Sequence, residues 1–92
     1  MSRFLVEVPH EPGPADCIRA IEIFLRTGSH FLSRADWGCL DGVHSAWMIV
    51  DVDSKDEARA IVPSAYRAEA RIVQLNTFTA AQVAELRSQH IP

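Results

Sequence analysis

The sequence predicts an α+β fold in which residues 1–92 form a single ferredoxin-like domain. Its expected order is the split-βαβ arrangement, β-α-β-β-α-β, followed by a C-terminal helix. Three observations carry this prediction. An Asp-Gly pair separates two runs rich in aromatic and β-branched residues, strand-like and helix-like periods alternate along the chain, and two capping-box motifs introduce the later helices. The four strands are expected to form one antiparallel sheet with its helices on a single face.

The central hairpin is predicted from Asp41-Gly42. Asp-Gly is typical of a two-residue type I′ turn, because both central positions of that turn need φ > 0. The flanking strands are expected at about residues 31–39 and 44–53.

This turn also predicts which residues face one another across the hairpin. With a two-residue loop, Trp37 faces Ala46 and Asp36 faces Trp47. The two tryptophans should therefore lie on opposite faces of the sheet. In the same register Phe31 faces Val52, and residues 30 and 53 are partners at the strand ends.

The first strand and helix follow from their periods. Residues 3–8 alternate between apolar and more polar positions, which indicates a strand. Residues 9–14 hold three prolines and should form a loop, because proline lacks the donor that a sheet needs. A helix is expected over residues 15–27, ended by Gly28. Its apolar stripe is expected to consist of Cys17, Ile18, Ile21, Phe24 and Leu25.

Capping motifs locate the remaining helices. Ser54 with Glu57 is a capping box that should start a helix with a buried stripe of Ala58, Ile61 and Val62. Pro63 should end that helix, and Ser64 should cap a further turn through residue 66. A fourth strand is expected over residues 71–76. Thr79 with Gln82 repeats the capping spacing before a last helix, residues 80–89.

Composition excludes several classes of function. The net charge is −3 and Lys55 is the only lysine, which argues against nucleic-acid binding. No apolar run approaches the length of a membrane span, and Glu7 comes too early for a signal peptide. The chain is therefore expected to be cytoplasmic, with Cys17 and Cys39 as free thiols.

The second half of the chain resembles the dimeric α+β barrel superfamily. The resemblance is carried by residues 44–78, especially IVDVDS at 49–54 running into Glu57-Ala58 and then Arg71-Ile72-Val73. Within the superfamily the chain is most similar to muconolactone-isomerase-like and YCII-like small proteins. The resemblance implies a homodimer with a cavity between the sheets or between sheet and helices. Members include isomerases, monooxygenases and proteins without known activity.

The helix-free face of the predicted sheet also suggests a partner. It is too apolar to be left in water, and a homodimer with two sheets face to face would cover it. The residues expected on this face are Leu5, Glu7, Arg34, Trp47 and Ile49.

A first candidate site lies on the same face, where a cavity lined by Glu7, Arg34, Asp36 and Trp47 would bind a small organic molecule. Gln74 or Asn76 would lie beside it. In a cofactor-independent isomerase or monooxygenase-like enzyme, Glu7 or Asp36 would be the base and Arg34 would hold a substrate carboxylate. The alternative is a dimer interface in which Arg34 neutralises one of the carboxylates.

A smaller candidate is the pair formed by His30 and Asp53 at the strand ends. An imidazole beside a carboxylate can orient a general base, although a surface salt bridge is the simpler interpretation.

A second cluster consists of His10, Cys17, Cys39 and His44. In this topology one end of the sheet brings together the segments that hold these residues. They are the end of the first strand, the start of the first helix and both ends of the hairpin loop. Cys39 and His44 should form a close cross-strand pair. Two thiolates and two imidazoles suit tetrahedral Zn²⁺, or a reactive thiol, and no other cofactor is expected. The alternative is cysteines that pack as small apolar groups and histidines at the rim.

Overall fold

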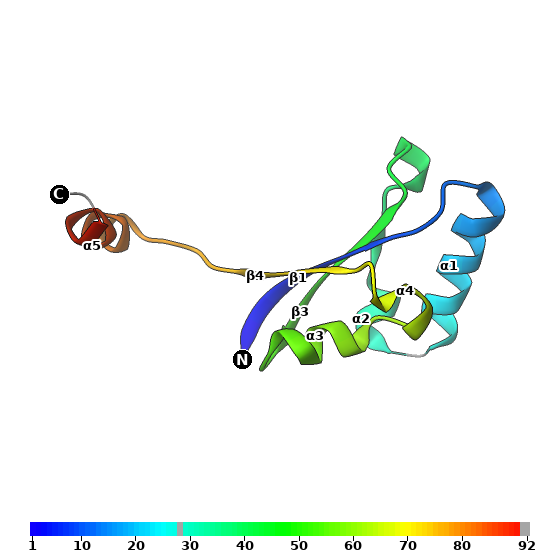
Figure 1. Cartoon of the computed structure of the whole chain (residues 1–92), viewed down its shortest axis with the longest axis horizontal. Helices are drawn as coiled ribbons and strands as arrows, with labels where there is room; N and C mark the ends of the chain where they lie inside the picture. The colour runs from blue at the N-terminus through cyan, green and yellow to red at the C-terminus, as the bar shows by residue number, and fades with distance from the viewer. Residues whose placement is uncertain (28, 91–92) are drawn as a thin grey trace.

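A computed structural model describes residues 1–27 and 29–90 as an α+β domain with one four-stranded antiparallel sheet (Figure 1). The strand order is β2-β3-β1-β4. The elements are β1 (Ser2–Pro9), α1 (Pro14–Arg26), α2 (His30–Ser33), β2 (Asp36–Trp37), the 3₁₀ turn η1 (Cys39–Asp41), β3 (Ser45–Val52), α3 (Lys55–Ile61), α4 (Ser64–Arg67), β4 (Arg71–Leu75) and α5 (Ala80–His90).

The core lies between one face of the sheet and the helices. Alternation along β1 turns Phe4, Val6 and Val8 inward, where their register partners in β3 are also buried. Helices α1 to α3 and the residue that ends α3 contribute buried side chains to the same cluster. They are Phe24, Leu32, Ala58 and Val62. The opposite face of the sheet receives none of these side chains.

Helix α1 forms within one residue of the predicted range, but its buried stripe differs from the prediction. Cys17, Ala20 and Phe24 are buried, whereas Ile18 and Leu25 are 58% and 59% exposed. At 100° per residue, positions 17, 20 and 24 fall on one line of the helix, and positions 18 and 25 lie about a quarter turn away. The predicted end at Gly28 lies outside the described residues.

The first arm of the predicted hairpin is mostly not a strand. Residues 30–33 form helix α2, because the Ser29 hydroxyl accepts a hydrogen bond from the Phe31 amide at 3.2 Å and Leu32 is buried in the core. The predicted partners at positions 31 and 52, and at 30 and 53, are therefore wrong. Strand β2 is limited to two residues.

The register of those two residues is confirmed. Asp36 pairs with Trp47 and Trp37 pairs with Ala46, so the two tryptophans lie on opposite faces. Because successive residues of a strand point to opposite faces, Trp37 lies on the side of the His/Cys cluster and Trp47 lies on the open face with the other candidate site.

The connection between β2 and β3 is longer than predicted. Gly42 has φ 78° and is the only described residue with positive φ, so a type I′ turn, which needs two such residues, does not form. Residues 39–41 make the 3₁₀ turn instead, and the Gly38 amide donates to the Ser45 carbonyl at 3.1 Å to close the loop. Cys39 and His44 therefore belong to a loop, not to a ladder.

The capping signals of the second half are confirmed. Ser54 Oγ accepts from the Glu57 amide at 3.1 Å, and the Glu57 carboxylate reaches back to the Asp53 amide at the same distance. Val62 is extended before Pro63, which ends α3 as expected. Helix α4 begins at Ser64, but its cap is Pro63 and not the predicted Ser64 side chain.

The chain beyond Leu75 leaves the body of the domain. We call residues 76–90 the C-terminal arm, which holds α5 far from the other helices in Figure 1. Every side chain from position 76 to position 89 is exposed. The radius of gyration is 16.4 Å, against about 12 Å for a compact chain of this length. Helix α5 begins with the predicted capping box, in which the Gln82 amide donates to Thr79 Oγ1 at 3.1 Å.

None of the helices in the described part of the chain has both the length and the apolar composition that are needed to cross a bilayer.

Candidate metal centre

Four residues with metal-binding side chains meet at one end of the sheet. They are His10, which follows β1, Cys17 in the first turn of α1, Cys39 in η1, and His44, which precedes β3. One donor atom from each lies within 4.8 Å of the other three. The predicted convergence of these segments is therefore confirmed.

The backbone fixes the two histidines beside each other. The His10 amide donates to the His44 carbonyl at 3.1 Å, which extends the β1–β3 ladder one step past the pair Pro9 and Ser45. The following loop turns the chain into α1, with Pro14 in the first helical positions, where its missing N–H leaves no bond unmade. This turn brings Cys17 back toward the strand ends.

The contacts within the cluster cross from one segment to another. Cys39 Sγ lies 3.2 Å from His10 Nε2, and Cys17 Sγ lies 3.4 Å from His44 Nδ1. The predicted close pair of Cys39 with His44 across two strands is wrong, because the 3₁₀ turn removes Cys39 from the ladder. Cys17 Sγ also lies 3.9 Å from His10 Nδ1, so the Cys17 thiol contacts both imidazoles.

The His10 ring is held in the orientation that a metal ligand needs. Its Nδ1 lies 2.9 Å from the Glu11 carbonyl oxygen, which can only accept, so the ring donates through Nδ1–H. In the neutral imidazole this leaves the lone pair on Nε2, the nitrogen that faces Cys39. Metal-bound histidines commonly donate their second nitrogen to a carbonyl in this way. The indole ring of Trp37 packs against the His10 ring at a centroid distance of 5.9 Å.

The thiol of Cys17 is almost fully covered, with 9% of the residue exposed. Burial raises the pKa of the Cys17 thiol, and the neighbouring Cys39 and Asp16 raise it further. The thiol is therefore protonated at neutral pH without a metal ion. Because a metal ion binds the thiolate, its affinity for this cluster should fall as the pH falls.

The donor set fits zinc. Tetrahedral Zn²⁺ with two sulfur and two nitrogen ligands places its donors about 3.3–3.8 Å apart. The two closest contacts, at 3.2 Å and 3.4 Å, are near this spacing, and contacts that approach 4.8 Å need to shorten by about 1–1.5 Å. Four protein ligands would complete the shell, which is characteristic of a structural centre.

An apolar hollow of about 520 Å³ borders three of the four residues. Apolar side chains beside the cluster lower the local dielectric constant, which strengthens the electrostatic attraction between a cation and its thiolate ligands. The lining consists of Pro12, Pro14, Cys17, Ile18, Ile21, Trp37, Cys39, Leu40 and His44.

Comparison of the chain with protein-family models, with curated proteins and with solved structures finds no match. The resemblance to dimeric α+β barrel proteins stays a prediction. The functional argument therefore depends on the geometry of the sites themselves.

The candidate site on the open face of the sheet assembles in part. Arg34, Asp36 and Trp47 line a hollow of about 330 Å³ together with Leu5, Met48 and Ile49. Glu7 is not part of that lining, although it is the register partner of Trp47.

The ion pair at Glu7 differs from the predicted one. Its carboxylate lies 3.6 Å from Arg71 Nη1, and among the described residues no ion pair within 4.0 Å joins it to Arg34. Arg71 was missed as a partner. The signal was available, because Arg71 begins the predicted fourth strand and is the register neighbour of Glu7.

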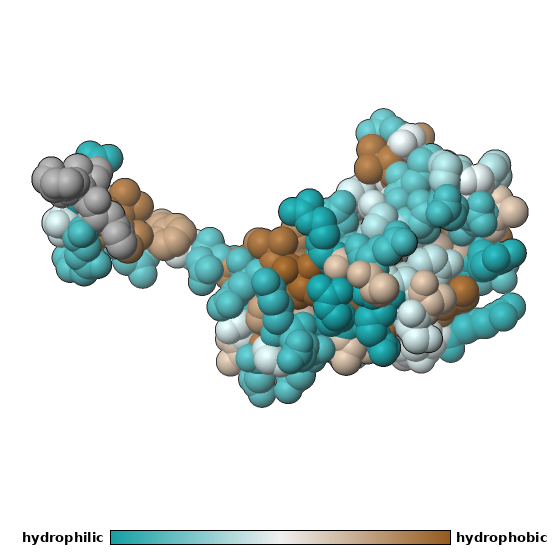
Figure 2. All heavy atoms as spheres, viewed as in Figure 1, coloured by the Kyte–Doolittle hydropathy of each residue, from teal (hydrophilic) through white to brown (hydrophobic). Residues whose placement is uncertain are grey.

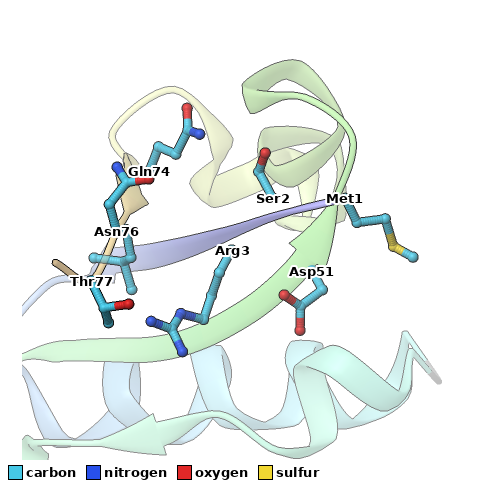
Figure 3. A pocket seen from close by; sticks show the side chains of 8 residues that line it. Met1, Ser2, Arg3, Asp51, Gln74, Asn76 and Thr77 are labelled. Atoms are coloured by element: carbon cyan, nitrogen blue, oxygen red, sulfur yellow. The ribbon is translucent and has the colours of Figure 1, made fainter. Parts of the chain in front are cut away.

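Gln74 and Asn76 lie away from this hollow. They border a different, polar one of about 470 Å³, where Figure 3 shows them with Arg3, Asp51 and Thr77. Gln74 is the register partner of Phe4 and therefore belongs to the helix-covered side of the sheet.

The predicted pair of His30 and Asp53 does not form. The Asp53 carboxylate lies 4.0 Å from the N-terminal amine, whereas the His30 ring stacks on Phe31 at a centroid distance of 4.1 Å. Helix α2 removes His30 from the strand position that the prediction required.

Proposed function

We propose that this protein binds one Zn²⁺ ion through His10, Cys17, Cys39 and His44. The observation that supports this most is the meeting of these four residues within 4.8 Å, although they come from segments far apart in the sequence. Packing alone does not require two imidazoles to face two thiols. The ion would join the end of β1, the start of α1 and the β2–β3 loop, so its role would be structural.

Titration with Co²⁺ tests this proposal, because tetrahedral cobalt with thiolate ligands gives intense visible bands and a near-ultraviolet charge-transfer band. The reduced, full-length protein is expected to bind one Co²⁺ per chain with this spectrum and to exchange it for Zn²⁺. Replacing Cys39→Ser should weaken the charge-transfer band and lower the affinity by tenfold or more, on the order of the effect of losing one ligand interaction.

The histidines offer a matched control for the cobalt experiment. His10→Ala should lose the tetrahedral spectrum, whereas His30→Ala, which removes an exposed histidine outside the cluster, should keep it. A weak octahedral spectrum, or equal binding by the His10 and His30 variants, would show that the cysteines and histidines only pack against one another.

The hollow on the open face supports a second function, the binding of a small organic acid. Arg34 would hold the carboxylate and Trp47 would cover the apolar part, with Asp36 placed to accept a proton. In this enzyme alternative Asp36, and not the ion-paired Glu7, is the stronger candidate for the base.

Benzoate is a suitable probe of this second function. Millimolar benzoate should shift the Trp47 indole N–H signal in a nuclear magnetic resonance spectrum. The shift should disappear in Arg34→Ala and persist in Arg19→Ala, which removes an exposed arginine on α1. If the two variants respond alike, the hollow does not recognise carboxylates.

We further infer that the domain belongs to the ferredoxin-like split-βαβ class. The strand order β2-β3-β1-β4 and the antiparallel pairing of each neighbouring pair support this assignment. The same assignment supports the expected use of the open sheet face as a contact surface.

A further inference from the structure

The two cysteine sulfur atoms of the cluster lie close to each other. Each cysteine offers only its Sγ as a donor atom, so the 4.8 Å limit on the cluster also holds for the distance between Cys17 Sγ and Cys39 Sγ. Both sulfurs contact the His10 ring, Cys17 at 3.9 Å and Cys39 at 3.2 Å. A disulfide needs about 2.05 Å between the sulfurs. Because Cys39 lies in the η1 turn and not in the sheet, its side chain can rotate toward Cys17 without breaking a strand pair.

The two thiols differ in their access to solvent. Cys39 is half-buried, whereas Cys17 is almost fully covered. Cys39 also faces His10 Nε2, which carries the lone pair of the ring and accepts the thiol proton. Cysteines that react first with an oxidant are accessible, lie beside a base and often have a second cysteine nearby that attacks the oxidised sulfur. Cys39 has the position of the reacting thiol, and Cys17 has that of the second, resolving thiol.

The hollow beside the cluster borders both sulfurs. Its volume of about 520 Å³ is typical of a small-molecule site. Apart from residues of the cluster, its lining is apolar and includes Ile18, Trp37 and Leu40. Figure 2 shows apolar atoms at the tip of the β2–β3 loop, where Leu40 is fully exposed. A molecule with a hydrocarbon body and a small polar end would bury its body in this hollow and hold its polar end at the sulfurs.

We propose that an organic hydroperoxide enters this hollow and oxidises Cys39 and Cys17 to a disulfide, and that the disulfide releases the Zn²⁺ ion. The release rests on the proposed metal function, whereas the oxidation of the two thiols does not. After oxidation only His10 and His44 remain as ligands, because zinc binds the cysteine thiolate and a disulfide has none.

The reaction balances with the hydroperoxide as the only oxidant. Cys39 Sγ attacks the terminal oxygen of the hydroperoxide, the oxygen–oxygen bond breaks, and Cys39 becomes a sulfenic acid. The departing alkoxide receives the Cys39 proton through His10 and leaves as an alcohol. Cys17 Sγ then attacks Cys39 Sγ, the sulfur–oxygen bond breaks, and hydroxide leaves as water with the Cys17 proton. The two sulfurs are oxidised and the two peroxide oxygens are reduced; when zinc holds both thiolates, the two protons come from the solvent.

The test loads the reduced, full-length protein with one Zn²⁺ per chain and adds cumene hydroperoxide. A zinc-sensitive dye follows the released ion, and mass spectrometry after blocking of free thiols follows the disulfide. We expect one intramolecular disulfide and one released Zn²⁺ per chain, and dithiothreitol with added Zn²⁺ should restore the starting state. Compared with free cysteine, the protein should prefer cumene hydroperoxide over hydrogen peroxide by about tenfold or more, on the order of the gain from burying part of the hydrocarbon body.

Two cysteine variants, compared with the metal-free wild type, separate the roles of the thiols. Cys17→Ser should stop at a sulfenic acid on Cys39, which dimedone labels. Cys39→Ser should react about tenfold more slowly, because the remaining thiol is covered.

Two variants of helix α1 test the hollow. Ile18→Asn, in the lining, should lose the preference for cumene hydroperoxide. Leu25→Asn is the matched control, because Leu25 is as exposed as Ile18 but lies outside the lining, and it should keep the preference. Both positions are exposed, and circular dichroism should show that both variants keep their secondary structure.

Two results would overturn the inference while the metal function stands. They are zinc-loaded protein in which cumene hydroperoxide forms no intramolecular disulfide, and a disulfide that forms without release of zinc. A preference no greater than that of free cysteine, or one lost equally in both α1 variants, would overturn the organic hydroperoxide as the oxidant. Protein that binds no Zn²⁺ would refute the proposed function and the release with it, and the disulfide measured in that protein would then decide the oxidation alone.

Discussion

Zinc is expected to raise the melting temperature of the reduced, metal-free protein by roughly 15–30 °C. Free Zn²⁺ at a thousand times its dissociation constant adds about 4 kcal/mol to the free energy of unfolding. For a domain of this size each 1 kcal/mol shifts the melting temperature by about 4–8 °C. Thermal unfolding followed by circular dichroism, with and without Zn²⁺, measures the effect, and a chelator should reverse it.

The zinc effect has two controls. Mg²⁺ prefers oxygen ligands and should leave the melting temperature unchanged. Cys17→Ser should remove most of the zinc-dependent increase while preserving the size of the side chain. An identical melting temperature in zinc and in chelator would contradict the metal centre.

The second large effect is expected from Phe24→Ala. Phe24 is 1% exposed, and its ring packs against Trp37 and Tyr66 at centroid distances of 4.8 Å and 6.3 Å. Removing the ring should lower the free energy of unfolding by about 3–5 kcal/mol, because it leaves a cavity in the core. Denaturant unfolding of the metal-free protein measures this loss.

The adjacent residue provides a control for Phe24. Leu25 is mostly exposed, so Leu25→Ala should change the free energy of unfolding by no more than about 0.5 kcal/mol. Because Trp37 lies between Phe24 and the His10 ring, Phe24→Ala should also weaken cobalt binding. Equal losses of stability in the two variants would show that Phe24 contributes no more to the core than the exposed Leu25 does.

The sequence predicted the features that depend on short-range chemistry or on topology. The capping boxes at Ser54 and Thr79 are local, because each bonds residues within one helical turn. The meeting of His10, Cys17, Cys39 and His44 follows from the element order, since the ends of neighbouring strands share one end of a sheet.

The wrong predictions concern contacts that hydrophobic periodicity and turn motifs do not describe. Residues 30–33 fit a strand by composition, but the Ser29 cap and the burial of Leu32 favour a helix. The predicted contact of Cys39 with His44 was also wrong, because a two-residue turn places Cys39 in a strand whereas η1 forms a longer loop. The capping motif of α5 predicts a helix but contains no information about what the helix packs against.

The loop between His10 and Cys17 also bears on how quickly the proposed metal site would capture an ion. Pro12 and Pro14 each fix one backbone dihedral angle, and the ladder bond at His10 anchors the loop at its start. Two of the four ligands are therefore preorganised by stiff covalent geometry, and little chain entropy remains to be lost when they close on a cation. Under the proposed function, two ligands would be prearranged on a sheet that is already in place, unlike in a zinc finger, which folds only as it coordinates its ion.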